Sequence, residues 1–167
     1  NETPEDYVVY LGRLNKEKGV IPAIEAARVA DQRVVVAGNV VGNYEWLYFL
    51  NEVQPMLNQE DHTRFRGEVT FEDKIELLKN AKALLFPIDR REPFGLVMIE
   101  AMACGTPVIA FNKGSVPEVV EDGATGFIVD TIEEMAEAMK KIGTIDRRRC
   151  RQRVEEHFTL TQMVDKY

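Results

Sequence analysis

Residues Tyr7 to Ala37 read YVVYLGRLNKEKGVIPAIEAARVADQRVVVA, and this stretch decides the fold. Its two ends, Tyr7–Leu11 and Arg33–Ala37, contain the continuously apolar runs VVYL and VVVA, which are typical of parallel strands covered on both faces. Between the two ends, four apolar residues form one face of an expected helix: Val20, Ile21, Ile24 and Ala27. The stretch therefore predicts a strand, a crossover helix and a second, parallel strand.

The same alternation continues along the rest of the chain. Four further short runs are expected to be strands: Thr63–Arg66, Ala83–Phe86, Pro107–Ala110 and Gly126–Val129. Two of the intervening helices carry a capping signal, because Asp73 follows Thr70, and Glu134 follows Thr131, at the spacing of a helix start. We predict an α/β fold with a doubly wound parallel sheet of about six strands.

The composition fits one globular domain over residues 1–167, large enough to bury a core without a disulfide or a metal. The net charge of −7 argues against nucleic acid and anionic membranes as general partners. Cys104 and Cys150 lack metal-binding spacing, so we expect reduced thiols in a cytoplasmic protein. No apolar run has the length of a transmembrane segment, about 18 residues. Because an expected strand begins by Tyr7, we expect the chain to be part of a longer protein.

Several loops of the expected sheet carry residues suited to a ligand. Ligands of an open α/β sheet bind beyond the carboxyl ends of its strands. The loops expected there carry glycines at Gly12, Gly38 and Gly67, and cations at Arg13 and Lys18. Because right-handed crossovers bring these loops to one edge of the sheet, their position alone predicts a ligand site.

The loop after the fourth expected strand leads into EPFGLVMIE, from Glu92 to Glu100. Pro93 and Gly95 are typical of a loop, and a helix is expected to begin near Leu96, which places Glu100 about one turn into it. The N–H groups of a helix start suit a phosphate, and carboxylates beside it can accept hydrogen bonds from sugar hydroxyls. Acidic residues near helix starts are also common for structural reasons, so the pair alone leaves that interpretation open.

Three common nucleotide-site motifs are absent from the sequence: GxxxxGK[ST], GxGxxG and DxD. The first two absences argue against an ordinary NTPase and against a nicotinamide dehydrogenase. Without the DxD carboxylates that commonly hold a nucleotide-bound metal, a departing diphosphate needs fixed cations. Arg13 and Lys18 are expected to supply them, although either one alone is more commonly a surface cation. We therefore predict no metal and no required cofactor at this site.

Several blocks of the sequence together resemble the retaining, GT-B-type glycosyltransferases of family 4. EPFGLVMIEAMACGTPVIA, from Glu92 to Ala110, resembles the E-x7-E signature of that family. Further blocks are YLGRLNKEKG at Tyr10–Gly19, VAG at 36–38, GEV at 67–69 and GSVPEVVEDGATGFIVD at Gly114–Asp130. The resemblance implies the Rossmann-like C-terminal, donor-binding half of a GT-B enzyme, whose N-terminal acceptor domain lies outside this chain.

The resemblance also implies roles for individual residues. Arg13 and Lys18 correspond to the pair that holds the donor diphosphate, and Glu92 corresponds to the carboxylate that contacts the transferred sugar. Glu100 corresponds to the carboxylate that binds the ribose hydroxyls. The other implied donor contacts are a small residue that leaves room for the nucleotide, a turn that touches the base, and backbone groups beside the sugar and phosphate: Gly12, Gly38, Glu68, Val69, Phe94, Gly95 and Leu96.

The activity implied by the resemblance is transfer of a hexosyl group from a nucleotide-diphosphate sugar, UDP- or GDP-hexose, with retention of configuration. The acceptor, a glycan, a lipid or a small molecule, would bind the absent N-terminal domain. We therefore expect the isolated chain to bind donor without efficient transfer, in a cytoplasmic enzyme with peripheral membrane attachment as an open alternative. The competing hypotheses are a sugar-nucleotide epimerase or a retaining phosphorylase on the same fold, and a binding module that has lost catalysis.

Two features outside these motifs are expected to be structural. Asp146–Phe158 is expected to be a helix whose arginine run forms a solvated face or contacts the missing domain. An aromatic group is expected to pack internally, with an acceptor platform as the alternative: Tyr44, Trp46, Tyr48 and Phe49.

Overall fold

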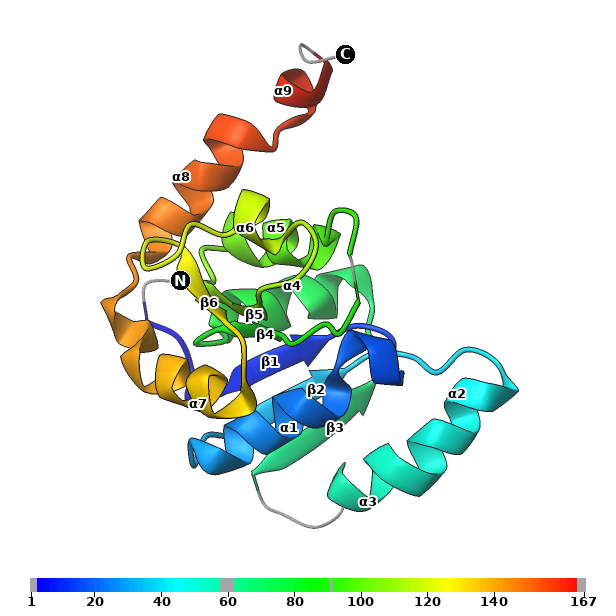
Figure 1. The fold of residues 1–167 in the computed structure, drawn as a ribbon. Helices are drawn as coiled ribbons and strands as arrows, with labels where there is room; N and C mark the ends of the chain where they lie inside the picture. The colour runs from blue at the N-terminus through cyan, green and yellow to red at the C-terminus, as the bar shows by residue number, and fades with distance from the viewer. Residues whose placement is uncertain (1–2, 58–61, 91, 165–167) are drawn as a thin grey trace.

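A six-stranded, all-parallel sheet forms the centre of the molecule in the computed structural model, which describes residues 3–57, 62–90 and 92–164 (Figure 1). The strand order is β3-β2-β1-β4-β5-β6. The strands are β1 (Val8–Leu11), β2 (Val34–Ala37), β3 (Thr63–Gly67), β4 (Leu84–Phe86), β5 (Val108–Phe111) and β6 (Gly126–Val129). All six lie where the sequence predicts a strand, and the doubly wound α/β class is confirmed.

The strand order changes direction between β1 and β4. On one side of β1, β2 pairs with β1 and β3 pairs with β2, since Val8 pairs with Val34 and Val34 with Thr63. The chain then crosses β1 to form β4, where Val9 pairs with Leu84, and continues outward through β5 and β6. Such a switch point leaves a crevice beyond the carboxyl ends of the two central strands.

Helices cover both faces of the sheet (Figure 1). One layer contains α1 (Val20–Val29), α2 (Asn43–Tyr48), the π-helical turn η2 (Phe49–Val53), α3 (Gln54–Leu57) and α7 (Ile132–Lys141). The other contains α4 (Phe71–Asn80), α5 (Leu96–Ala103), α6 (Val116–Val119) and α8 (Arg147–His157). Short 3-10 turns precede α1 (η1, Lys16–Lys18) and α8 (η3, Ile142–Thr144), and α9 (Leu160–Val164) follows α8. In the described residues, no helix has the length and apolarity to cross a membrane.

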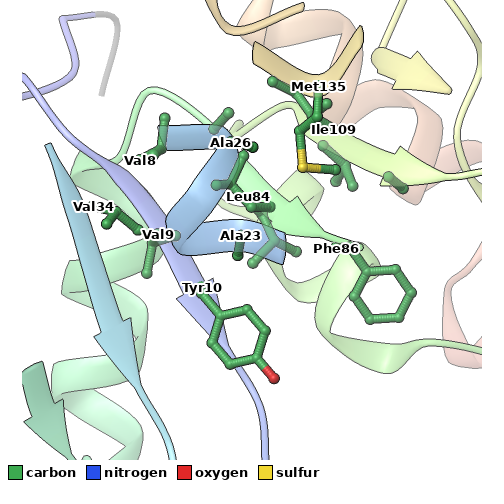
Figure 2. Close-up of a cluster of buried hydrophobic side chains, with 14 of the residues drawn as sticks. Val8, Val9, Tyr10, Ala23, Ala26, Val34, Leu84, Phe86, Ile109 and Met135 are labelled. Carbon is green, nitrogen blue, oxygen red and sulfur yellow. The ribbon is translucent and has the colours of Figure 1, made fainter. Parts of the chain in front are cut away.

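The core lies on both faces of the central strands (Figure 2). Val8, Val9 and Leu84 are fully buried at the middle of the sheet, and Met135 of α7 packs in the same cluster. The predicted helix starts are also present, because the hydroxyls of Thr70 and Thr131 accept hydrogen bonds from the backbone N–H groups three residues later. Buried apolar strands and capped helices therefore hold the loops at the carboxyl edge in place.

The arginine run of α8 is bound to the domain at three positions, contrary to the prediction of a solvated face or an external contact. Arg147 donates to the carbonyls of Ala81 and Lys79 and to the hydroxyl of Thr106, each over 2.8–2.9 Å. The other two bound arginines are Arg149, which contacts Glu121, and Arg153, which donates to the carbonyls of Glu118 and Val119. These contacts attach α8 to α4, to α6 and to the loop that precedes β5. Arg148 and Arg151 are exposed as predicted, and Arg151 pairs with Glu155 on the same helix.

The expected aromatic packing is only partly correct. Tyr48 and Phe49 are buried, and the ring of Trp46 meets Phe49 edge-on with centroids 5.7 Å apart. Tyr44, however, is 83% exposed in the first turn of α2. The prediction of packing is therefore wrong for Tyr44, whereas an acceptor platform on α2 stays a prediction.

Cys150 gives the fold a titratable group in its core. The thiol is fully buried and lies 3.5 Å from the carbonyl oxygen of Thr125, and burial raises its pKa from 9.0 to about 12. At a pH between these two pKa values, the unfolded chain loses the thiol proton while the folded chain keeps it. The free energy of unfolding therefore falls as pH rises through this range.

We expect the stability advantage of the wild-type chain over Cys150→Ala to shrink by about 1 kcal/mol between pH 8 and pH 10. Urea unfolding of both proteins at the two pH values measures it. Taking the difference between the two proteins removes the contribution of the tyrosines, which titrate in both. An advantage that stays constant across this range would contradict the assignment.

Candidate functional site

An open cleft of about 1020 Å³ lies beyond the carboxyl ends of β1 and β4, at the switch point of the sheet. Clefts that hold small molecules have volumes of about 300 to 1,000 Å³. Leu11 and Gly12 at the end of β1 and Phe86 at the end of β4 form its floor, and the start of α5 forms one side. An open cleft therefore lies at the edge of the sheet where the sequence predicts a ligand site.

Lys18 enters the cleft from the 3-10 turn η1, which follows β1. The turn is held by Asn15, whose side chain accepts a hydrogen bond from the backbone N–H of Lys18 over 2.9 Å. Asn15 is itself nearly buried and donates to Glu45 of α2 over 2.9 Å. The backbone that carries Lys18 is thus fixed by a buried amide, which sequence reasoning did not single out.

Arg13 lies on the same side of the cleft, with its guanidinium 3.6 Å from the carboxylate of Glu45. A hydrogen bond from Asn15, with further help from the backbone N–H of Val41 and the charge of Arg13, lowers the pKa of Glu45 below its usual value. Glu45 therefore stays ionised at neutral pH and restrains Arg13 from outside the cleft. The side chain of Arg13 is still about half exposed, which leaves its other donors available to a ligand.

Glu92 reaches Lys18 across the cleft. Its carboxylate lies 2.5 Å from the ammonium of Lys18, and the carbonyl of Glu92 accepts a hydrogen bond from the backbone N–H of Ser115. The loop that carries Glu92 is therefore tied to the loop after β5 on one side and to η1 on the other. Two members of the expected catalytic set are in direct contact, and Arg13 lines the same cleft.

Helix α5 begins at Leu96 as predicted and directs its N-terminus into the cleft. Gly95 caps the helix in the left-handed conformation with φ +72°, and a Cβ at this position would lie 2.4 Å from the methyl group of Met98. Phe94, Gly95 and Leu96 all line the cleft. The first N–H groups of a helix have no partner within it, so this helix start can donate to an anion.

Glu100 lies one turn into α5 and lines the cleft, as predicted. Its carboxylate is 2.7 Å from the ammonium of Lys74, which belongs to α4 and lines the same cleft. Sequence reasoning missed Lys74, because nothing in its local sequence shows which way the side chain points from α4. Each of the two glutamates is therefore paired with a lysine.

Three expected donor contacts lie outside the residues that line the cleft. A Cβ at Gly38 would lie 1.8 Å from the carbonyl oxygen of Gly12, so the glycine allows two loops to touch. Its expected role in leaving room for the nucleotide stays a prediction. Glu68 and Val69 form the connection between β3 and α4, beside the cleft rather than within it. Their contact with the base stays a prediction.

The far wall of the cleft comes from the carboxyl-terminal part of the chain. His157, Phe158 and Gln162 line it, and the ring of Phe158 meets that of Phe94 with centroids 6.4 Å apart. Sequence reasoning did not assign these residues to the site, since their distance from the motif along the chain hides the contact.

A family model described as glycosyl transferases group 1 matches residues 1–157 of this chain. The chain belongs to this family. The matched region of this group 1 glycosyltransferase chain contains the six-stranded sheet, both lysine–glutamate pairs and Arg13. Membership of family 4 and retention of configuration stay predictions.

Curated relatives carry transferase and synthase names. N-acetyl-alpha-D-glucosaminyl L-malate synthase of Bacillus anthracis is 27% identical over 98% of this chain and 44% of its own length. D-inositol 3-phosphate glycosyltransferase of Mycobacterium sp. (strain KMS) is 35% identical over 75% of this chain and 29% of its own length. The chain thus spans less than half the length of these relatives, whose names favour group transfer over the epimerase and phosphorylase hypotheses.

Solved structures share the architecture over nearly the whole chain. Sucrose-phosphate synthase from Thermosynechococcus elongatus matches with 28% identity and a TM-score of 0.82, covering 98% of this chain and 45% of that one. HepE from Anabaena, solved in complex with UDP and glucose, matches with 22% identity and a TM-score of 0.82, covering 96% and 47%. This group 1 glycosyltransferase chain therefore has the Rossmann-like fold of GT-B enzymes.

Proposed function

We propose that this chain is the donor-binding part of a two-domain, retaining glycosyltransferase that transfers a hexosyl group from UDP-hexose. The observation that carries the proposal is the pairing of cations and carboxylates in one cleft at the start of α5: Arg13, Lys18, Lys74, Glu92 and Glu100. Cations and a helix N-terminus suit a diphosphate, and carboxylates suit hydroxyl groups. The choice of uridine over guanosine is supported by the UDP complexes of the HepE structures.

In this proposal Arg13 and Lys18 neutralise the departing diphosphate, so that no metal ion is required. Glu92 accepts hydrogen bonds from the transferred sugar, and Glu100 binds the ribose hydroxyls. Fixed positive groups aimed at a developing negative charge stabilise a transition state more than a ground state. The acceptor would bind the remainder of the protein, and the chain alone would bind donor without efficient transfer. The free thiols of Cys104 and Cys150 support a cytoplasmic location.

Thermal unfolding of the chain in the presence of UDP, GDP or ADP tests the proposal. A ligand at 100 times its dissociation constant adds about 2.7 kcal/mol of stability, which raises the melting temperature of a chain this size by roughly 5 to 10 °C. We expect such a shift with UDP, and we expect Glu100→Ala, through at least about tenfold weaker binding, to reduce it by about half or more at the same UDP concentration.

The matched control is Glu137→Ala, which removes a carboxylate paired with Lys140 on α7, away from the cleft. This variant should keep the full shift. A UDP shift that persists in EDTA would support binding without a metal. If none of the three nucleotides stabilises either this chain or the full-length enzyme, the proposed function is wrong. Displacement of UDP by inorganic phosphate would instead favour a phosphorylase.

A further inference from the structure

Lys74 joins two helices at the edge of the cleft. It lies one turn into α4, while its partner Glu100 lies one turn into α5, and their charged atoms are 2.7 Å apart. Both side chains line the cleft. Lys74 is thus the contact through which α4 reaches the carboxylate assigned to the ribose.

The ammonium of Lys74 is held from two sides. Besides Glu100, it lies 5.1 Å from the centre of the Phe71 ring, within the range of a cation–π interaction. Its side chain is 21% exposed, whereas that of Glu100 is 36% exposed. The lysine is therefore the more buried member of the pair, and its position is fixed by α4, whose start is capped by Thr70.

A carboxylate beside a diphosphate has two disadvantages that Lys74 removes. A freely rotating carboxylate loses conformational entropy when it binds two hydroxyls, and its negative charge repels the phosphates. The ammonium donates a hydrogen bond to the Oε1 atom of Glu100, and a carboxylate has further lone pairs, on Oε2 and on Oε1, that can accept from hydroxyl donors. It also neutralises the carboxylate in the same contact.

We propose that Lys74 is a positioning residue that orients and neutralises Glu100, so that the site selects nucleotides with an intact ribose diol. This inference rests on the proposed function of the cleft and assigns to α4 a part in it. Lys74 acts through Glu100, and therefore its removal reduces the contribution of the ribose hydroxyls to binding more than that of the phosphates or the base.

The test measures dissociation constants of UDP and of 2′,3′-dideoxy-UDP by calorimetry for the wild-type chain and four variants. We expect the wild-type chain to prefer UDP by at least about tenfold, the effect of losing a hydrogen bond to a charged group. In Lys74→Met this preference should fall to less than about threefold, close to that of Glu100→Ala. Lys74→Arg, which keeps a donor for the carboxylate, should restore most of the preference.

Lys79→Met is the matched control, since Lys79 lies on the same helix, pairs with Glu76 and does not line the cleft. It should keep the wild-type preference. An unchanged preference in Lys74→Met, even with weaker binding of both ligands, would overturn the inference and leave the proposed function intact. Failure of the wild-type chain to bind any nucleoside diphosphate would overturn both.

Discussion

The Lys18→Met variant of the full-length enzyme should turn over about 100 to 1,000 times more slowly than the wild type. Lys18 is a cation that lines the cleft from a turn with a fixed backbone. In the proposed reaction, negative charge builds up on the diphosphate as the sugar departs. The loss should therefore appear in kcat, because the interaction is stronger in the transition state than in the bound donor. Initial rates at saturating donor and acceptor measure it.

Lys16→Met is the control for this experiment. Lys16 belongs to the same 3-10 turn, is exposed and does not line the cleft, so its loss changes the local charge equally. Its turnover should stay close to that of the wild type. Turnover of Lys18→Met within about threefold of the wild type would contradict the role of Lys18 in charge stabilisation.

The Arg147→Ala variant should lose about 3 kcal/mol of stability. Arg147 donates to three acceptors on two other segments of the chain, and its removal leaves the buried hydroxyl of Thr106 and the carbonyl of Ala81 without this donor. Unsatisfied buried acceptors keep their full desolvation cost. For a chain of this size, the melting temperature should fall by about 6 to 12 °C.

Arg151→Ala provides the matched comparison on the same helix. Arg151 pairs with Glu155, one turn further along, and exposed pairs of this kind contribute less than about 0.5 kcal/mol. Chemical unfolding of both variants measures the two losses under identical conditions. Equal losses would show that the arginines of α8 act through charge alone and not through the contacts of Arg147.

The architecture was predictable because each of its signals is local. Apolar runs such as VVYL and VVVA give the strands, and Thr70 and Thr131 give helix starts that the structure confirms. The edge of the sheet that holds the site follows from the parallel order, since right-handed crossovers place all strand-to-helix loops together. Arg13, Lys18, Glu92 and Glu100 could therefore be assigned to one cleft from sequence position.

The remaining features depend on side-chain direction across elements, which local sequence does not contain. Lys74 and Glu100 are 26 residues apart, and their contact depends on how α4 lies against α5. The arginine run of α8 has the composition of a solvated face, yet Arg147 is turned inward by acceptors on β-strand loops distant in the chain. The close approach of Gly38 to the backbone of Gly12 likewise depends on how two loops meet in the fold.

The contact between Lys18 and Glu92 has a consequence for the order of events after transfer. In the proposed function, a diphosphate that binds Lys18 displaces Glu92 from this cation, and the hydroxyls of the hexosyl group offer the carboxylate new partners. The two halves of the donor are therefore thermodynamically coupled: each makes the binding of the other more favourable. Once the sugar has left, Glu92 no longer has sugar hydroxyls as partners. The nucleotide must then compete with this carboxylate for Lys18. Under the proposed function, we therefore expect the ion pair to promote release of the spent nucleotide and to limit product inhibition.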